Sequence, residues 1–582
     1  MLCWDSRSAW AGSSLSAANR RHVMRIPGEH LRKYSPILGG LAIVLMVLAA
    51  YAPAVHGGFV WDDDTYVTRN PLLTAPDGLH RIWFTTDSPS QYFPLVYTAF
   101  RAERSLWGLD PVGYHVVNIL LHIANSLLLW LILRRLRIPG AWLAAAIWAV
   151  HPVNVESVAW ITERKNTLST LFYLLTILAY MRFTDLQGRR AGAYYGLGLL
   201  FCALALFAKT TACTIPAALL IVHWIRKQPV TSKRVAQVVP FGVMGAGMGL
   251  LSVWWEQTQQ GTKGPEFALE PMQRLLVSGH ALWFYLGKLA WPVRLMFSYP
   301  DWRLEVHDPV QYVWPVACLV LAVVLWIFRK SWGRGPLITA AFFAAVLSPM
   351  LGFISLYTFR YTYVADHYQY LACAAPIALF AALIARWRSR AAVSAIILAA
   401  LCLLTWRQAG TYQDSRTLWG DVLAKNPQAW VAHWGLGLAL AQDGQPAEAE
   451  PHFKRALRLH PIFWEGCLNL GSALRDQGKL DEAKVWFAKG LKLKPDSPAL
   501  RCSLADILVA QRRSAEAIPL YEAALKTDPS LVQPHMCLED IYVRLGKRNE
   551  AIKELEAILK LMPDLQEARD KLQILRAEER MQ

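Results

Sequence analysis

Residues 113–133 read GYHVVNILLHIANSLLLWLIL, a mostly apolar run. About 20 apolar residues in a helix cross the hydrocarbon core of a bilayer, so this run is long enough to span a membrane. Arg134, Arg135 and Arg137 follow directly, as is typical where a span ends on the cytoplasmic side. The run therefore predicts a membrane-spanning helix.

The composition agrees with a membrane protein. Of 582 residues, 54% are hydrophobic and 18% are charged, whereas soluble proteins carry about 25% charged residues. This excludes a disordered scaffold and disfavours a purely soluble enzyme. The net charge of +17 comes entirely from residues 1–410, since residues 411–582 carry 24 basic and 24 acidic side chains. A basic, apolar part followed by a neutral part predicts a membrane domain and a soluble domain, with no nucleic-acid partner.

Eleven apolar runs are predicted to cross the membrane. They lie near 36–55, 115–133, 140–153, 166–183, 193–209, 212–226, 236–254, 311–328, 336–354, 367–385 and 391–407.

The orientation follows from six basic clusters, which alternate with basic-poor connections. If 275–291 lies in the interface or re-enters, all six clusters face the cytoplasm, the N-terminus is cytoplasmic and the chain after 407 is outside. If 275–291 crosses, there are 12 spans and the C-terminal part is cytoplasmic. We favour 11 crossings. The clusters are Arg25/Arg32/Lys33, Arg134/Arg135/Arg137, Arg182/Arg189/Arg190, Arg226/Lys227/Lys233/Arg234, Arg329/Lys330/Arg334 and Arg386/Arg388/Arg390.

Five prolines recur at intervals of 34 residues in the C-terminal part, which is the tetratricopeptide period. Small and aromatic residues keep the same phase, as in Leu470-Gly471 and Phe487, and glycines mark the turn inside each repeat except at Arg512. Each repeat is predicted to be two packed amphipathic helices that end at a proline. The prolines are Pro427, Pro461, Pro495, Pro529 and Pro563.

The predicted fold is therefore all-α, with a polytopic membrane domain and an α-solenoid. We expect a flexible basic N-terminus (1–33), a multispanning domain (34–407), one half and about four full repeats (411–563) and a capping helix (564–582). The nine cysteines are scattered without zinc-ligand spacing, so no metal site is predicted.

The first outer segment contains three adjacent carboxylates in GFVWDDDTYVTRNP, residues 58–71. Adjacent carboxylates repel, so the pKa of one of them is expected to rise. Such a group suits a general base that acts on a hydroxyl. Asp62, Asp63 and Asp64 are all candidates, and the alternative is an ordinary solvated loop.

The second outer segment, HPVNVESVAWITERK (151–165), places Glu156 and Glu163 seven residues apart, on one face of a helix. Arg164 and Lys165 follow them and can meet a phosphate or pair with the acids. Two more cations are predicted on the outer side, Lys209 and Arg360, where an anionic lipid phosphate would explain them. The alternative for these two is snorkelling.

Five segments together carry a resemblance. They are FVWDDDTYVTRNPLL (59–73), YFPLVYTAF (92–100), the run at 113–133, HPVNVESVAWITERKNTL (151–168) and FRYTYVADHYQYL (359–371), followed by the repeats. The chain resembles the transmembrane and tetratricopeptide-repeat O-mannosyltransferases and their bacterial relatives, within the glycosyltransferase-C superfamily.

The resemblance implies a multispanning enzyme that uses a lipid-phosphate sugar and acts outside the cytoplasm. Asp62 and Asp63 match the acidic pair of the family, Glu156 matches the acidic position of the second loop, and Arg360 precedes the aromatic segment. The run Tyr361-Thr-Tyr363-Val departs from the usual pattern there.

The leading hypothesis is a glycosyltransferase of the bacterial inner membrane. It would move a sugar, which the family likeness suggests is mannose, from a polyprenyl-phosphate donor to Ser or Thr of exported proteins. Asp62, Asp63 and Glu156 are the candidate catalytic residues, and Lys209, Arg360 and Arg164 would hold the donor phosphate. The repeats would bind the acceptor polypeptide. One alternative is a non-catalytic membrane-anchored scaffold, and another is transfer to a lipid or glycan acceptor.

Overall fold

The computed structural model describes residues 28–262, 267 and 269–580. Every regular element within these residues is a helix, which confirms the all-α prediction. The chain divides into a unit that ends at Ala42 and a larger unit that begins at Ile43. Of the segment predicted to be flexible, residues 1–27 lie outside the described residues and residues 28–33 belong to the helix α1.

The apolar half of the chain forms twelve long or medium helices besides those of the first outer segment. They are α1 (Gly28–Tyr51), α4 (Pro111–Arg135), α5 (Ala141–Ala149), α7 (Arg164–Asp185), α8 (Gly188–Ala208), α9 (Ile215–Ile225), α10 (Ser232–Thr258), α11 (Pro271–Ala290), α12 (Val313–Ile327), α13 (Gly335–Leu347), α14 (Ala374–Ile384) and α15 (Arg390–Ala409).

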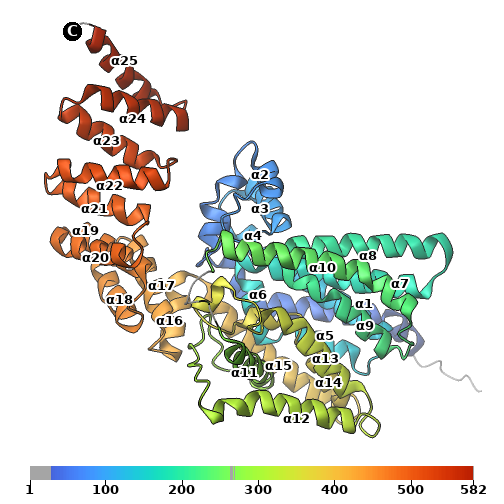
Figure 1. Cartoon of the computed structure of the whole chain (residues 1–582). Helices are drawn as coiled ribbons and strands as arrows, with labels where there is room; N and C mark the ends of the chain where they lie inside the picture. The colour runs from blue at the N-terminus through green and yellow to red at the C-terminus, as the bar shows by residue number, and fades with distance from the viewer. Residues whose placement is uncertain (1–27, 263–266, 268, 581–582) are drawn as a thin grey trace, which may run out of the picture. The chain divides into compact units, whose positions relative to one another are not determined.

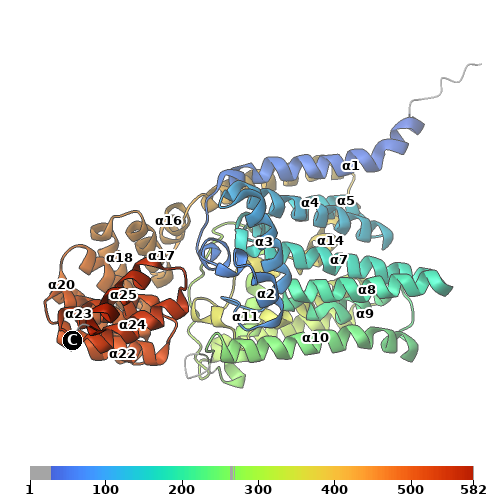
Figure 2. The same ribbon diagram turned by 90° about the horizontal axis from the view of Figure 1, so that it is seen from above.

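Six of the described helical segments are long and apolar enough to cross a membrane: those built on α4, α7, α8, α10, α12 and α15. Shorter apolar helices lie at Pro36–Ala50, Thr210–Ile225, Gly335–Met350 and Ala374–Ile384. Helices α7, α8 and α10 run beside one another, and α4 packs against α7 (Figure 2). The chain is therefore an integral membrane protein, while the count of 11 crossings stays a prediction.

Two predicted spans are shorter in the structure than in the sequence pattern. The run 140–153 forms only α5, because Pro152 cannot continue the helix and a 3-10 turn, η4 (Pro152–Asn154), follows. The nine residues of α5 rise about 14 Å, roughly half the hydrocarbon thickness. The run 367–385 begins with the 3-10 turn η11 (Asp366–Gln369) before α14. The turn η11 carries Asp366 and His367 of the candidate site.

The first outer segment is folded. It contains the turns η1 (Ala52–His56), η2 (Asp64–Thr68) and η3 (Pro71–Leu73) and the helices α2 (Gly78–Phe84) and α3 (Pro94–Trp107). Its own apolar core includes Ile82, Tyr97 and Phe100, which are all fully buried. The acidic stretch therefore lies at the start of a packed unit.

The C-terminal helices stack as antiparallel pairs, coloured orange to red in Figure 1. The residue types that set the pattern are in contact as predicted: a Cβ added to Gly471 would lie 2.4 Å from the ring of Phe487. Only a glycine therefore allows this close helix approach. The helices are α16 (Ser415–Lys425), α17 (Trp430–Gln442), α18 (Pro446–Leu459), α19 (Trp464–Asp476), α20 (Leu480–Leu493), α21 (Pro498–Ala510), α22 (Ser514–Thr527), α23 (Val532–Arg544), α24 (Arg548–Leu561) and α25 (Gln566–Arg580).

The turn between the two helices of a repeat requires left-handed backbone. Gly444, Gly478 and Gly546 have φ of 75°, 78° and 70°, and Arg512 occupies the equivalent place with φ of 61°. A left-handed conformation costs a residue with a Cβ about 1–2 kcal/mol. The third full repeat therefore keeps its turn at the expense of backbone strain.

We expect Arg512→Gly to raise the free energy of unfolding of the repeats by about 0.5–1 kcal/mol, since glycine removes the strain but also gains freedom in the unfolded chain. Urea unfolding of the purified chain in detergent, followed by circular dichroism, measures the change. Gly478→Ala is the matched reverse change and should lower stability. A destabilising Arg512→Gly would mean that the arginine side chain contributes more than its backbone costs.

The predicted topology can be tested by thiol labelling in a background without native cysteines. With 11 crossings, cysteines at Gln260, Asp308 and Gln566 label from outside with an impermeant reagent, and cysteines at Arg190 and Arg388 do not. Permeabilised cells provide the control that every position can react. A protected Gln566 beside a labelled Gln260 would indicate 12 crossings and cytoplasmic repeats.

Candidate active site

The segment 57–63 is held in place by its backbone. The N–H of Gly58 donates to the carbonyl of Gln413 at 2.7 Å. The carbonyl of Val60 accepts a hydrogen bond from the indole Nε1 of Trp160 at 3.3 Å. These contacts link the first outer segment to the second and to the residues that precede the repeats.

Trp61 turns the chain just before the three carboxylates. Its φ of 52° lies in the left-handed region, which costs about 1–3 kcal/mol for a residue that is not glycine. Its ring meets those of Trp419 and Trp434 edge-on, at centroid distances of 5.0 and 5.2 Å. Aromatic contacts of this kind contribute about 0.5–1.5 kcal/mol each beyond burial, so they help to hold the strained turn.

Asp63 has both carboxylate oxygens occupied. It is fully buried, and Oδ2 accepts from the N–H of Val60 at 2.8 Å. Oδ1 accepts from the N–H and the hydroxyl of Thr162, at 2.8 and 2.5 Å. Burial raises the pKa of Asp63 to about 7, although these hydrogen bonds act to lower it. Asp63 therefore fastens one outer segment to the other.

Asp62 is half-buried, and its carboxylate has no hydrogen bond or ion pair with any residue that the structure describes. Burial raises the pKa of Asp62 to about 6, and the negative charge of Glu163 adds to this, while Lys165 and His367 act to lower it. A free carboxylate with this pKa is suited to accept a proton near neutral pH.

Asp64 lies at the surface. Its Oδ1 accepts from the hydroxyl of Thr68 at 2.8 Å, and its Oδ2 lies 3.3 Å from Nη2 of Arg69. Of the three adjacent carboxylates, Asp62 is thus the one that faces the buried charges without a partner.

A cluster of buried charges surrounds Glu163, which ends the 3-10 turn η5 (Ile161–Glu163) and is fully buried. Its Oε1 lies 2.9 Å from Nζ of Lys165 and 3.7 Å from Nε2 of His367. Its Oε2 lies 3.6 Å from Nζ of Lys209. Burying an unpaired carboxylate costs solvation free energy, so the positive charges of the two lysines stabilise the buried Glu163. The negative charge of Glu163 in turn stabilises the two buried lysines.

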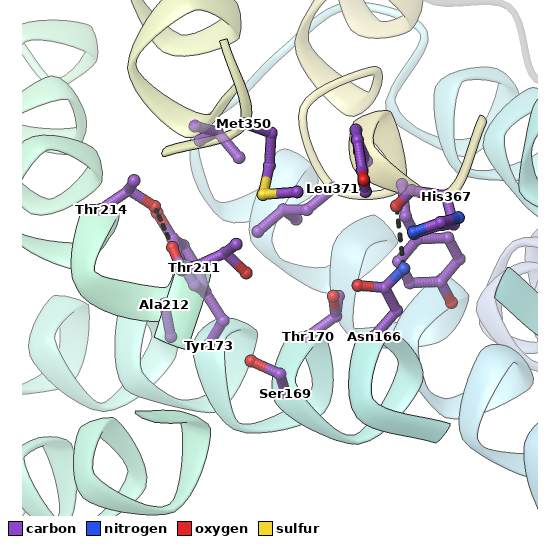
Figure 3. A pocket seen from close by; sticks show the side chains of 13 residues that line it. Asn166, Ser169, Thr170, Tyr173, Thr211, Ala212, Thr214, Met350, His367 and Leu371 are labelled. Carbon is purple, nitrogen blue, oxygen red and sulfur yellow. Dashed lines mark hydrogen bonds between the residues drawn. The ribbon is translucent and has the colours of Figure 1, made fainter. Parts of the chain in front are cut away.

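His367 joins this cluster to Glu156, which lies in the short helix α6 (Val155–Ala159). The Nδ1 of His367 is 3.0 Å from Oε1 of Glu156, and the backbone N–H of His367 donates to Oε2 of Glu156 at 3.0 Å. The side-chain amide of Asn166 donates to the carbonyl of His367 at 2.8 Å (Figure 3). The side-chain oxygen of Asn166 accepts from Nζ of Lys209 at 2.7 Å. Four separate segments of the chain therefore meet at one group of polar side chains.

Asp366 lies beside this group and is buried. The hydroxyl of Tyr299 donates to its Oδ2 at 2.9 Å. Burial, followed by the negative charge of Glu156, raises the pKa of Asp366 well above its usual range. Burial and the neighbouring carboxylate thus both disfavour the charged form of Asp366.

A small cavity of about 30 Å³ extends from Asn166 and His367 into the helices. Its walls carry hydroxyl groups from α7 and from the turn η6 (Thr210–Thr214), among them Thr170 and Tyr173 (Figure 3). The volume is enough for about one water molecule and too small for a sugar.

Arg164 has a different environment from the one the sequence predicts. Its guanidinium is buried, forms an ion pair with Glu103, and donates to the carbonyl of Tyr114 at 2.9 Å and to the side chain of Asn118. These contacts fasten α7 to α3 and α4. No side chain of the charged cluster around Glu163 contacts Arg164 in the described structure, so it is an internal cross-link there.

Arg360 also has protein partners. Its two terminal nitrogens pair with both carboxylate oxygens of Glu465, at 2.8 and 2.9 Å, and its guanidinium lies 5.4 Å from the ring centroid of Phe463. Glu465 belongs to α19, in the second full repeat. Arg360 thus connects the membrane part to the repeats.

The structure brings Glu156 and Lys209 into one cluster with Glu163, and Asp62 lies near enough for charges of this cluster to shift its pKa. It leaves Arg164 and Arg360 outside the cluster and gives Asp63 a bonding role. The pairing of Lys165 with Glu163 is one of the two roles that the sequence predicts for it, whereas no sequence pattern assigned His367, Asn166 or Asp366. A polar Asp-His pair inside the aromatic segment 359–371 was the available signal for two of them.

Within the residues that the structure covers, no group of three or more His, Cys, Asp or Glu side chains has the geometry of a metal site. The arrangement is that of a polytopic helical membrane protein with a buried ionisable cluster and a helical-repeat domain.

Comparison with known proteins finds two kinds of similarity, each in a part of the chain. Residues 94–255 match the family described as dolichyl-phosphate-mannose-protein mannosyltransferase. Residues 407–462, 440–507 and 498–531 match tetratricopeptide repeats. The chain is thus related to the transmembrane and tetratricopeptide-repeat O-mannosyltransferases, which confirms the resemblance found in the sequence.

Three similar proteins illustrate the relationship. The chain is 22% identical to protein O-mannosyl-transferase F38B6.6 of Caenorhabditis elegans, over 72% of this chain and 62% of that protein. It is 24% identical to protein O-mannosyl-transferase TMTC1 of Homo sapiens, over 71% of this chain and 54% of that protein. It is 31% identical to protein O-mannosyl-transferase TMTC4 of Homo sapiens, over 31% of this chain and 28% of that protein. The chain thus spans less than two thirds of the length of these relatives.

We expect Asp63→Asn to destabilise the protein by about 1–3 kcal/mol, because an amide cannot accept all three hydrogen bonds and leaves a buried donor without a partner. Asp62→Asn loses no such bond and should leave stability unchanged. Thermal unfolding of both purified variants in detergent measures the difference. Equal stability of the two variants would contradict the bonding role of Asp63.

Proposed function

We propose that the chain is an inverting membrane glycosyltransferase. It moves a sugar, with mannose as the first candidate, from a polyprenyl-phosphate donor to a hydroxyl of an exported polypeptide. The family relationship supports the reaction class, and the relatives are named protein O-mannosyl-transferases. The charged cluster supports the place of the reaction.

The observation that carries the proposal is the state of Asp62. It is a half-buried carboxylate with a pKa of about 6, and it has no partner among the described residues although buried charges surround it. A structural carboxylate at such a place would be paired, as Asp63 and Glu163 are. An unpaired carboxylate beside a buried charged cluster fits a general base.

In the proposed step, Asp62 takes the proton of the acceptor hydroxyl. The hydroxyl oxygen then forms a bond to the anomeric carbon, on the face opposite the phosphate. The bond from that carbon to the phosphate oxygen breaks, and polyprenyl phosphate leaves with the electron pair. Lys165 and Lys209 are the cations of the cluster, and they can stabilise the charge that develops on the leaving phosphate.

This assignment changes two of the residues chosen from the sequence. Lys165 replaces Arg164, whose guanidinium is occupied inside the protein. Arg360 is assigned to holding the repeats through Glu465. Lys209 keeps its role, and Glu156 orients His367.

The repeats would hold the acceptor polypeptide. Trp434 of α17 contacts Trp61, which directly precedes the proposed base. An acceptor bound along the first full repeat therefore lies near Asp62. We place the cluster and the repeats on the outer face of a bacterial inner membrane, in the 11-crossing orientation.

The test is transfer of labelled mannose from polyprenyl-phosphate mannose to exported proteins by membranes that contain the chain. We expect Asp62→Asn to lower the rate about 10²- to 10⁴-fold, the range for loss of a general base. With Asp62 intact, the rate should fall as the pH drops below about 6, because the base becomes protonated there.

Asp64→Asn is the matched control, since it removes a neighbouring carboxylate that lies at the surface. Its activity should equal that of the unchanged protein. If Asp62→Asn and Asp64→Asn transfer sugar equally well, Asp62 is not the base. If the unchanged chain transfers no sugar to protein, lipid or glycan, the non-catalytic scaffold is the better description.

A further inference from the structure

A second cavity lies apart from the Asp62 cluster, at the end of the last candidate span. Its volume is about 240 Å³. It forms where the segment after α11 meets the end of α15 and the end of α16. Arg294, Arg407 and Lys425 each come from a different one of these three segments.

The cavity carries a net positive charge. Lys425 pairs with Asp421, also in the wall, at 2.6 Å and donates to the carbonyl of Leu295 at 2.7 Å. The side chains of Arg294 and Arg407 are exposed and make no hydrogen bond or ion pair with the part of the chain that is described. Two guanidinium groups therefore face the same cavity without a counter-charge.

Arg294 is also held in an unusual conformation. Its φ of 51° lies in the left-handed region, which is costly for arginine. The carbonyl of Arg294 accepts a hydrogen bond from Nζ of Lys288 at 3.0 Å, which helps to fix this turn. The guanidinium therefore starts from a fixed backbone position at the cavity.

Tryptophans beside the cavity indicate that it lies at the membrane surface. Trp291 and Trp406 precede the two arginines closely in sequence and are 72% and 51% exposed. Exposed tryptophans on a membrane protein are typical of the headgroup level, where an amphipathic ring is stable. Arg407 lies in the last turn of α15, one of the six candidate spans. Leu403 is half exposed one turn earlier and offers apolar surface next to the cavity.

We infer that this cavity binds the headgroup phosphate of an anionic phospholipid. Guanidinium groups bind phosphate through paired hydrogen bonds, and basic pockets at the level of the headgroups bind anionic lipids. A lipid bound there would contact α15 of the membrane part and α16, which leads into the repeats. It would stabilise this junction, and its binding does not depend on the proposed sugar transfer.

The test uses the full chain in detergent and short-chain phosphatidylglycerol, with binding measured by native mass spectrometry. The variant Arg294→Gln/Arg407→Gln should bind this lipid about 10- to 30-fold more weakly, since each basic residue contributes about one factor of five. The charge-matched control Arg458→Gln/Lys492→Gln removes two exposed cations from the repeats and should bind like the unchanged protein. Phosphatidylcholine should bind weakly to all three proteins.

Three outcomes would overturn the inference: equal binding by the two double variants, equal binding of phosphatidylglycerol and phosphatidylcholine, or displacement of the lipid by millimolar inorganic phosphate. The last would assign the cavity to free phosphate. If the double variant does not fold, Arg294→Gln and Arg407→Gln are measured singly, and each must weaken binding. Loss of sugar transfer is not part of this readout, so the two proposals can fail separately.

Discussion

The candidate site depends on the three hydrogen bonds that Asp63 accepts. Two of them come from Thr162 and tie the first outer segment to the residue before the buried Glu163, and the third comes from Val60 within the same segment. The same bonds set the direction of Asp62, because Asp63 fixes the backbone on one side of it and the strained Trp61 fixes it on the other. Together with the hydrogen bond from Trp160 to the carbonyl of Val60, this constraint holds close together the free carboxylate and the buried cations, which lie on two separate segments.

Burying the charged cluster around Glu163 costs solvation free energy, so its presence indicates a role other than stability. Each buried ion loses solvation worth several kcal/mol, and a mutual pairing only offsets this cost. Stability alone would be served as well by apolar side chains of similar volume. Two lysines, two glutamates and a histidine held within contact of one another therefore point to a role in charge stabilisation, which is the role that the proposed reaction gives them.

The sequence predicted the repeats well because a fixed interval of 34 residues determines both helices and their contacts. It predicted the membrane helices by composition, but the turn at Pro152 shortened one of them. It could not choose between Arg164 and Lys165, since successive helical residues point about 100° apart and only packing decides which face is inside. The contact between Glu156 and His367 joins positions 211 residues apart, so no local pattern reveals it.

The aromatic contacts of Trp61 connect the repeats to the chemistry. A left-handed tryptophan is stable only while its surroundings hold it, and part of those surroundings are Trp419 and Trp434 at the start of the repeats. The pairing of Arg360 with Glu465 holds the next repeat to the same region. A movement of the first repeats would therefore reach the residue before Asp62. In the proposed enzyme, the repeats would both select the acceptor polypeptide and position the base Asp62. A small molecule that carries a hydroxyl but does not bind the repeats would then meet a less ordered site.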